Sequence, residues 1–420
     1  MWLLNILSLQ LCSFELRQAP QFAILSHTWG KEEVTFQDLT ERPNDRNKLG
    51  WKKILGMCAL CRTMGLDWVW IDTCCIDKSS SAELSEAINS MFAYYNLSEF
   101  CIAYLEDVPP DIHLPHDEIG GEKSSSAFRE SRWFTRGWTL QELIAPKRVY
   151  FHARDWSVIG EKASLIHILH SITLVDPKVL GEPLMRRHCC IAERMSWASR
   201  RETTRPEDEA YSLMGIFSVH MPLLYGEGGK RAFLRLQQEI LKESTDHSLF
   251  TWTAMSKMHF EEPSETTNSV LAYADWGGLL AYSTREFAHC NKVRTRYLNG
   301  KIDREPYEMT NMGLRISLPT IELNESVYLA ILDCSSSDQE KAYLGIWLLQ
   351  NNHKRTDGKE FMRLIHHKPV NVTVERLDAV RSDTLDVVAQ LPGDCVREVK
   401  IRMMFIEESR VREVRIEKSD

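Results

Sequence analysis

The residue whose type and position best suit chemistry is Glu142, in the segment Arg136–Pro146 (RGWTLQELIAP). It comes four residues after Trp138, near the start of a predicted helix. A carboxylate held beside an aromatic ring in a cleft has a pKa that its surroundings can shift, which suits acid–base or charge-stabilising chemistry. The plainer interpretation is a surface glutamate on a helix that packs through the leucines and the isoleucine around it.

Two other segments carry side chains suited to contact a ligand. An apolar run ends in His27-Thr-Trp29-Gly, and Asp72 ends a second apolar run and begins a cysteine-rich loop. An aspartate in this position either caps the loop or contacts a ligand, and the residues leave both interpretations open. Trp29 either stacks on a flat ligand ring or closes the end of the core.

Two other motifs have the spacing of a functional site, but neither is predicted to be one. Cys58 and Cys61 have the spacing of a redox or zinc motif, but they lie within a predicted helix and no second pair follows at ligand spacing. They are predicted to be buried thiols, and no metal site is expected.

The segment Gly226–Lys230 resembles a phosphate-binding loop. A Walker A loop is excluded because Leu224 replaces its first glycine and Arg231 its Ser or Thr.

The composition favours a soluble globular protein. The chain has 420 residues, 26% of them charged, and a net charge of −8 with acidic and basic residues mixed. No basic block or aromatic–basic stripe is present, so no nucleic-acid partner is expected. The eleven cysteines do not follow the pattern of a small secreted scaffold, which favours reduced thiols and a cytoplasmic location.

The apolar start of the chain, Met1–Phe14, resembles a targeting segment only superficially. It lacks a basic n-region and a cleavage site, and three polar residues interrupt it. A buried strand or short ribbon is the favoured interpretation, and the segment is too short to span a bilayer. No other run is long enough for a membrane span.

Apolar runs and helical spacing alternate in the first part of the chain. Buried strands are predicted at Gln21–Ser26, Asp67–Asp72, Phe100–Leu105 and Arg148–His152. Helices are predicted between them at Trp51–Met64, Ser81–Tyr95 and Trp138–Ala145. This alternation indicates a parallel sheet with helices on both faces. Ligands bind beyond the carboxyl ends of such strands, so residues 27–30 and 72–78 should face one crevice, and Glu142 joins them if its helix begins there.

The pattern divides the chain into three regions. An α/β domain is predicted for residues 1–160, a helical extension for 161–245, and a β-rich domain for 246–420. In the last region, short segments rich in β-formers predict antiparallel strands. These segments are Leu314–Leu318, Val327–Leu332, Val370–Val374 and Val399–Phe405.

Three blocks resemble the signature of the fungal heterokaryon incompatibility (HET) domain, in the family's order. They are Phe22–Gly30 (FAILSHTWG), Trp70–Lys78 (WIDTCCIDK) and Arg136–Leu143 (RGWTLQEL). Residues 197–208 and 224–228 resemble segments that often follow, so the resemblance covers roughly residues 1–250. It implies a role in non-self recognition after hyphal fusion and in triggering programmed cell death. It also implies self-association and other incompatibility proteins as partners.

The HET domain in turn distantly resembles the Toll/interleukin-1 receptor (TIR) domain, which implies a flavodoxin/TIR-like parallel sheet. Ile24–Ser26 resembles the first TIR block and Asp72 the second. The segment Trp138–Leu143 resembles the Trp-Cys-x-x-Glu-Leu of enzymatic TIR domains, with Thr139 in place of the cysteine. In those domains this glutamate is required for cleaving the nicotinamide–ribose bond of NAD.

The TIR resemblance implies a catalytic role for Glu142 and NAD+ as a substrate, with no cofactor and no metal. Cleavage passes through an oxocarbenium-like ribosyl centre, which a carboxylate can stabilise. Substrate contacts are expected from a further set of side chains: Ser26, His27, Trp29, Asp72 and Trp138.

Two alternatives to the enzyme remain open at this point. One is a death-signalling adaptor or interaction module without chemistry, which the replacement of cysteine by Thr139 favours. The other is a regulator whose recognition surface is the region from residue 246 onward.

Overall fold

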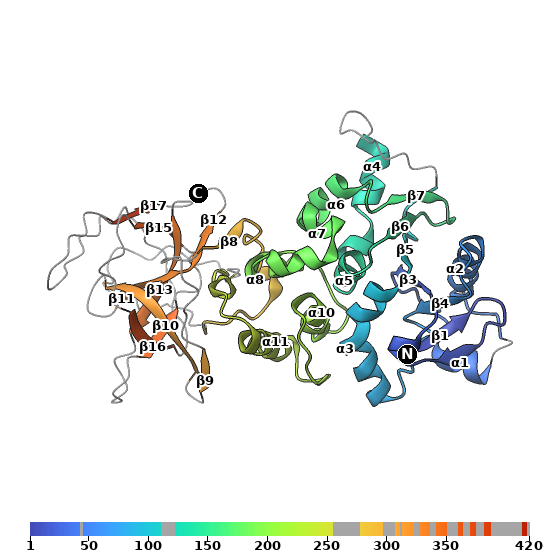
Figure 1. The fold of residues 1–420 in the computed structure, drawn as a ribbon, viewed down its shortest axis with the longest axis horizontal. Helices are drawn as coiled ribbons and strands as arrows, with labels where there is room; N and C mark the ends of the chain where they lie inside the picture. Colours follow the sequence, from blue (N-terminus) through green and yellow to red (C-terminus); the bar gives the residue numbers. More distant parts are fainter. Residues whose placement is uncertain are drawn as a thin grey trace, which may run out of the picture. The chain divides into compact units, whose positions relative to one another are not determined.

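The computed structural model describes most of the first 254 residues and separate segments after them (Figure 1). The described ranges are 1–42, 45–110, 122–254, 278–296, 307–310, 313–322, 327–336, 342–350, 360–363, 370–374, 382–387 and 414–417. They separate into two compact units. The first comprises residues 1–187 and 201–232, and the second 188–200 and 233–420. This division cuts through residues 161–245, which the sequence analysis takes as one helical extension.

A seven-stranded sheet with the order β2-β1-β4-β3-β5-β6-β7 forms the centre of the first unit. Its strands are β1 (Trp2–Asn5), β2 (Leu11–Ser13), β3 (Ala23–His27), β4 (Trp68–Ile71), β5 (Phe100–Tyr104), β6 (Val149–His152) and β7 (Val158–Glu161). The pairs β3–β4, β3–β5 and β5–β6 are parallel. The predicted parallel sheet is confirmed for these four strands. Three of them lie within a predicted apolar run, and β3 extends one residue beyond its run, to His27.

The outer strands differ from that prediction, because they pair antiparallel. β1 pairs antiparallel with both β2 and β4, and β7 pairs antiparallel with β6. Residues 2–13 therefore form the short ribbon that was expected at the start of the chain. A parallel strand needs a crossover connection of a dozen or more residues, whereas hairpins need only a short turn. The short connections β1–β2 and β6–β7 explain the antiparallel edges.

The strand order determines where a ligand site can form. Numbered along the chain, the four parallel strands lie in the order 2-1-3-4, so the connection direction reverses between β3 and β5. In open α/β sheets the crevice at this reversal, beyond the carboxyl ends of the strands, is where ligands bind. Ser26 and His27 end β3 at this point, and Asp72 directly follows β4.

Helices cover both faces of this sheet. α2 (Trp51–Thr63) and α3 (Ser81–Leu97) lie on opposite sides of β3 and β4 in Figure 1. α3 begins at Ser80, whose side chain accepts a hydrogen bond from the backbone of Glu83, as expected for an N-cap. α5 (Thr139–Ile144) contacts α3 and β3. Two shorter helices, α1 (Phe36–Glu41) and α4 (Glu122–Arg129), also belong to this unit.

The segment from residue 161 to 245 is mostly helical, as its spacing predicts. Its α-helices are α6 (Ile166–Thr173), α7 (Pro177–Gly181), α8 (Ile191–Ser196), α9 (Asp208–Tyr211), α10 (Met214–Phe217) and α11 (Gly229–Glu243). α10 packs on α3 in the first unit, whereas α8 belongs to the second.

The second unit is rich in strands. It holds a two-stranded sheet of β8 (Val293–Thr295) and β12 (Cys334–Ser336) and one of eight strands. The eight are β9 (Glu308–Thr310), β10 (Gly313–Glu322), β11 (Val327–Leu332), β13 (Tyr343–Gln350), β14 (Glu360–Arg363), β15 (Val370–Val374), β16 (Ser382–Val387) and β17 (Val414–Glu417).

Three of the four strands predicted for the second unit lie in β10, β11 and β15. The fourth, residues 399–405, lies outside the described residues. The antiparallel prediction is confirmed for most pairs but is wrong for β14 and β16, which pair parallel. Across the described residues, no helix combines the length and the apolar character that crossing a bilayer requires.

Candidate active site

A cavity of about 280 Å³ in the first unit brings together most of the residues singled out from the sequence. It is lined by His27 and Trp29 after β3, by Asp72 after β4, and by Trp138 and Glu142 of the α5 region. Ser26 is fully buried and contacts Glu142 instead of lining the cavity. The expectation that residues 27–30 and 72–78 share one crevice with Glu142 is thus met by the geometry, while the role of each residue remains a prediction.

Glu142 is not a surface residue, so the plainer interpretation of this side chain is wrong. Only 7% of Glu142 is exposed, and all six residues of α5 are buried. A short helix buried on every side has no solvent face, and a polar side chain on it must find partners inside the protein. Glu142 therefore points its carboxyl group into a region of buried polar atoms.

A chain of hydrogen bonds holds the Glu142 carboxyl group. The indole Nε1 of Trp133 donates to Ser26 Oγ at 2.7 Å, and the Ser26 hydroxyl donates to Glu142 Oε2. Trp133 lies in the 3₁₀ turn Arg132–Thr135 and is fully buried. The sequence analysis did not identify Trp133, because nothing in its local pattern distinguishes a hydrogen-bonding indole from an ordinary core tryptophan.

The surroundings of Glu142 favour its neutral form. Burial, together with the negative charge of Asp72, raises the pKa of Glu142 from an ordinary value of 4.5 to about 8. Hydrogen bonds from Ser26 and Tyr95 and the positive charge of Arg201 act in the opposite direction without cancelling the rise. The loss of hydration raises the pKa of a buried carboxyl group by more than hydrogen bonds from neutral donors lower it.

Asp72 lies in a different environment within the same cavity. His27 Nε2 is 3.0 Å from Asp72 Oδ1, and the indole nitrogen of Trp29 donates to Asp72 Oδ2 at 2.7 Å. Burial raises the pKa of Asp72, but the hydrogen bond and charge of His27, the charge of Lys78 and the Trp29 hydrogen bond together lower it below its ordinary value. Asp72 is therefore ionised, and the side chains that stabilise its charge, His27, Trp29 and Lys78, line the same cavity.

Trp29 is about half exposed, so it does not close the end of the core. The ammonium group of Lys78 lies 3.8 Å from the centre of its ring, a cation–π contact that fixes one face of the indole. The indole nitrogen is held by Asp72. A stacking role for Trp29 stays a prediction, and its ring is already oriented by two neighbours.

A strap of residues 201–208, which the sequence analysis did not assign to the site, holds the loop before α5. The backbone of Glu202 donates to Thr135 and accepts from Gly137, at 2.7 and 2.9 Å. A Cβ atom at Gly137 would lie 2.5 Å from the Thr203 side chain, so a larger residue here would force that side chain to move. The strap thus fixes the position from which α5 begins.

Arg201, at the start of this strap, is buried behind α5. One of its guanidinium nitrogens donates to the Arg136 carbonyl at 2.8 Å and to Thr139 Oγ1 at 2.9 Å. The Thr139 hydroxyl itself donates to the carbonyls of Trp133 and Arg136. Thr139 is therefore a structural link between the strap and α5.

A further part of the cavity wall comes from the strap and from the segment after α10. Tyr225 donates its hydroxyl to Asp208 at 2.9 Å, and the Arg205 guanidinium lies 4.2 Å from the centre of the Tyr225 ring. Burial raises the pKa of Asp208, although hydrogen bonds from Trp138 and Tyr225 partly offset this. Residues 197–208 and 224–228 carry the sequence signal for this wall, since both resemble segments that often follow the three signature blocks.

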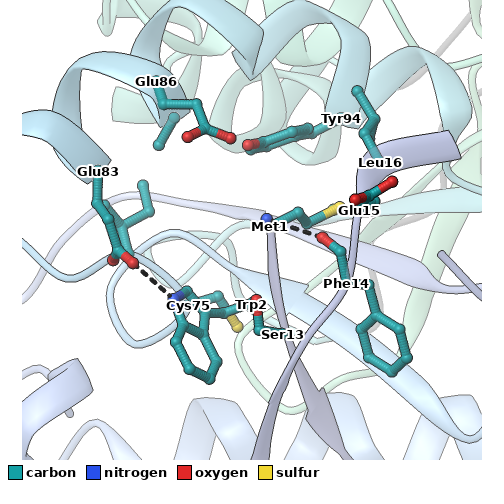
Figure 2. Close-up of a pocket in the computed structure, with 12 residues that line it drawn as sticks. Met1, Trp2, Ser13, Phe14, Glu15, Leu16, Cys75, Glu83, Glu86 and Tyr94 are labelled. Carbon is teal, nitrogen blue, oxygen red and sulfur yellow. Dashed lines mark hydrogen bonds between the residues drawn. The ribbon is translucent and has the colours of Figure 1, made fainter. Parts of the chain in front are cut away.

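A second cavity of about 400 Å³ lies between the amino-terminal ribbon and α3 (Figure 2). Glu15, Glu83 and Glu86 line it, and Glu83 accepts a hydrogen bond from the Trp2 indole at 3.2 Å. It contains none of the residues predicted for the site. Ile76, after β4, lines both cavities.

The two cysteines with redox or zinc spacing are buried thiols of α2, as predicted. Cys58 and Cys61 are both free. Burial raises the pKa of Cys58 to about 11 and that of Cys61 to about 12. Thiols with such values stay protonated near neutral pH and are poor nucleophiles.

Comparison with known proteins gives two family matches. Residues 22–120 match the family described as heterokaryon incompatibility protein (HET), and residues 231–390 match a domain of unknown function, DUF8212. The chain is also 47% identical over 227 residues to the vegetative incompatibility protein HET-E-1 of Podospora anserina. That match covers 53% of this chain but 16% of the relative, so the chain spans only a small part of the relative's length. No solved structure matches significantly.

Proposed function

Since the chain carries a heterokaryon incompatibility (HET) domain, we propose that it acts as an effector of vegetative incompatibility. In this role it triggers programmed cell death on non-self recognition, and it does so by cleaving NAD+ in the cavity that Glu142 lines. The enzymatic part of this proposal rests on the buried carboxyl group of Glu142. Ser26 holds this group by a hydrogen bond, and Glu142 and Asp72 line the same cavity.

The lining of the cavity suits the parts of a dinucleotide. Trp29, Trp138 and Tyr225 offer aromatic faces for flat rings. Arg136 and Arg205 offer guanidinium groups, which bind phosphate oxygens in pairs of hydrogen bonds. Both arginines line the same cavity as Asp72 and Glu142. An anionic ligand with a cationic ring matches this mixture of charges.

Cleavage of the nicotinamide–ribose bond needs little from the protein beyond orientation and charge. The leaving group departs as neutral nicotinamide, and the ribosyl centre becomes cationic. Preorganised negative charge in a site that excludes water stabilises that cation more than water would. The apolar wall of Ile88 and Met91 supports such exclusion.

The test of this proposal is the NAD level in cells that express the wild-type chain or Glu142→Ala at matched abundance. Alanine removes the carboxyl group in either protonation state. We expect NAD to fall and cells to die with the wild type only. Glu130→Ala, which changes an exposed glutamate outside the cavity, is the matched control and should behave as wild type.

The second candidate is a death-signalling adaptor that binds partners without chemistry. Thr139 favours it, because this residue replaces the cysteine of enzymatic TIR domains and is bound up in contacts with the backbone and Arg201. In that case cells expressing Glu142→Ala still die, provided the variant folds, and NAD holds steady in both. This outcome would end the enzymatic proposal and turn the search to binding partners.

A further inference from the structure

Three carboxyl groups line the candidate site, and two of them, Asp72 and Glu142, lie in surroundings of opposite character. This difference assigns the two groups different tasks. We propose that Asp72 is the ionised carboxylate that faces the ribosyl cation, and that Glu142 works in its neutral form as a hydrogen-bonding group to the substrate. The proposal rests on the proposed function, because it concerns the same reaction and the same cavity. It differs from what the TIR resemblance implies, where the residue at position 142 supplies the negative charge.

The groups around Glu142 are mostly neutral. They come from three elements. Ser26 of β3 donates a hydrogen bond to Glu142. The Tyr95 hydroxyl of α3, which donates to the Leu25 carbonyl at 3.2 Å, and the thiol of Cys101 of β5 lie close enough to interact with the carboxyl group. Two charges affect the pKa of Glu142: the positive charge of Arg201 lowers it, and the negative charge of Asp72 raises it. The guanidinium of Arg201 is directed instead at Thr139 and the Arg136 carbonyl.

The groups around Asp72 favour negative charge. Both carboxylate oxygens are engaged by ring nitrogens, Oδ1 by His27 and Oδ2 by Trp29. Lys78 adds a positive charge to the cluster, whereas the thiol of Cys74 and the hydroxyl of Tyr95 are neutral neighbours. The other ring nitrogen of His27, Nδ1, lies 4.0 Å from a carboxylate oxygen of Glu33, so Glu33 adds a second negative charge near the ring without a hydrogen bond to it.

Two carboxyl groups whose surroundings drive their pKa values apart take different parts in a reaction. The pKa of Glu142 is raised to about 8, and that of Asp72 is lowered. At pH 7 Asp72 is therefore a carboxylate, and Glu142 is a carboxylic acid. Only the carboxylate can stabilise a developing positive charge, and only the acid can donate a hydrogen bond to a ribose hydroxyl.

The reaction balances with water as the second reactant. The bond between the ribose C1′ and the pyridinium nitrogen breaks, and its electron pair neutralises the nicotinamide ring. Water adds to C1′ and loses one proton, first to Asp72 and then to solvent. The products are nicotinamide, ADP-ribose and one proton, and Glu142 keeps its own proton throughout.

The experiment is the pH dependence of nicotinamide release from NAD+ by the full chain, from about pH 5 to 10. If Glu142 acts as an acid, the rate falls tenfold per pH unit above about pH 8, where Glu142 ionises. Asp72→Asn should lower the rate by about 10²-fold or more at every pH, the usual loss for a charge-stabilising group. Glu142→Gln should stay within about tenfold of the wild type at pH 7 and lose the alkaline fall, because glutamine resembles the neutral acid.

Asp77→Asn is the matched control, since it changes a carboxylate of the same loop that does not line the cavity. It should leave the rate unchanged. A rate that rises through pH 8, with Asp72→Asn close to the wild type, would overturn the proposal while leaving NAD+ cleavage intact. A wild-type chain that releases no nicotinamide at any pH sinks both the cleavage and the role assigned to Asp72.

An infrared difference spectrum between the wild type and Glu142→Gln at pH 7 tests the charge assignment without any turnover. The expected difference contains the carbonyl band of a neutral carboxylic acid. A difference that contains only carboxylate bands means that Glu142 is ionised, which contradicts the proposal. This measurement does not require Asp72→Asn to fold.

Discussion

The first unit holds two cavities that contain carboxyl groups in unlike settings. The one beside the amino-terminal ribbon has Glu15 and Glu86 exposed to solvent, whereas the one at the carboxyl ends of β3 and β4 has Glu142 buried. Cavity volume does not identify the candidate site, since the cavity beside the amino-terminal ribbon is the larger of the two. We call that cavity the acidic cavity. The difference is desolvation, which gives the Glu142 carboxyl group a pKa near neutrality and leaves the exposed glutamates screened by water.

The largest difference expected between the two cavities is in how their carboxyl groups change the free energy of unfolding with pH. Glu142 has its pKa raised from 4.5 to about 8, so the folded state binds an extra proton between these values. Its contribution to stability is complete below about pH 4.5 and is lost as pH rises through 8, by up to about 5 kcal/mol. Urea unfolding of the wild type and Glu142→Gln across this range measures it. An equal pH slope in both proteins would mean that Glu142 is not desolvated.

A smaller loss is expected from Arg201→Met. Methionine fills part of the volume but removes the guanidinium donor from the Arg136 carbonyl and from Thr139 Oγ1, and it removes a positive charge from beside Glu142. We expect a loss on the order of 3 kcal/mol in unfolding free energy, and a further rise in the pKa of Glu142. Thermal unfolding against Arg200→Met, which changes the exposed neighbouring arginine, checks the first effect. Equal losses in the two variants would show that Arg201 has no special role.

The smallest effect belongs to the acidic cavity. Glu86→Gln changes an exposed side chain, so its unfolding free energy should stay within about 0.5 kcal/mol of the wild type. Nicotinamide release should not change either, because Glu86 does not line the cavity of Glu142. A large loss of release in this variant would assign function to the other cavity and break the comparison.

The sequence allowed the strands and their carboxyl ends to be predicted because they are short apolar runs that stop at polar loops. Neighbouring residues of a strand point to opposite faces, and this explains why Ser26 contacts Glu142 while His27 contacts Asp72. The placement of these side chains could be anticipated from the strand ends and the family motifs.

The burial of Glu142 could not be predicted in this way. It depends on Trp133, on Tyr95 and on Arg201, which is 59 residues away in the chain. A local pattern of charged and apolar residues around α5 is compatible with an exposed face, because the segments that cover it come from elsewhere. Likewise the parallel pair β14–β16 has no signature in residue type that separates it from its antiparallel neighbours.

The chain passes repeatedly between the two units, with residues 188–200 in the second, 201–232 back in the first, and the remainder in the second. The residues that line the site run to Tyr225, well past the HET match at 22–120. A recombination event that moved only the matched segment into another protein would carry Asp72 but leave Glu142, its arginine and half of the cavity wall behind. The segment that carries this site is therefore longer than the HET match at residues 22–120, and an exchange between genes would preserve the site only if it moved residues 26–225 together.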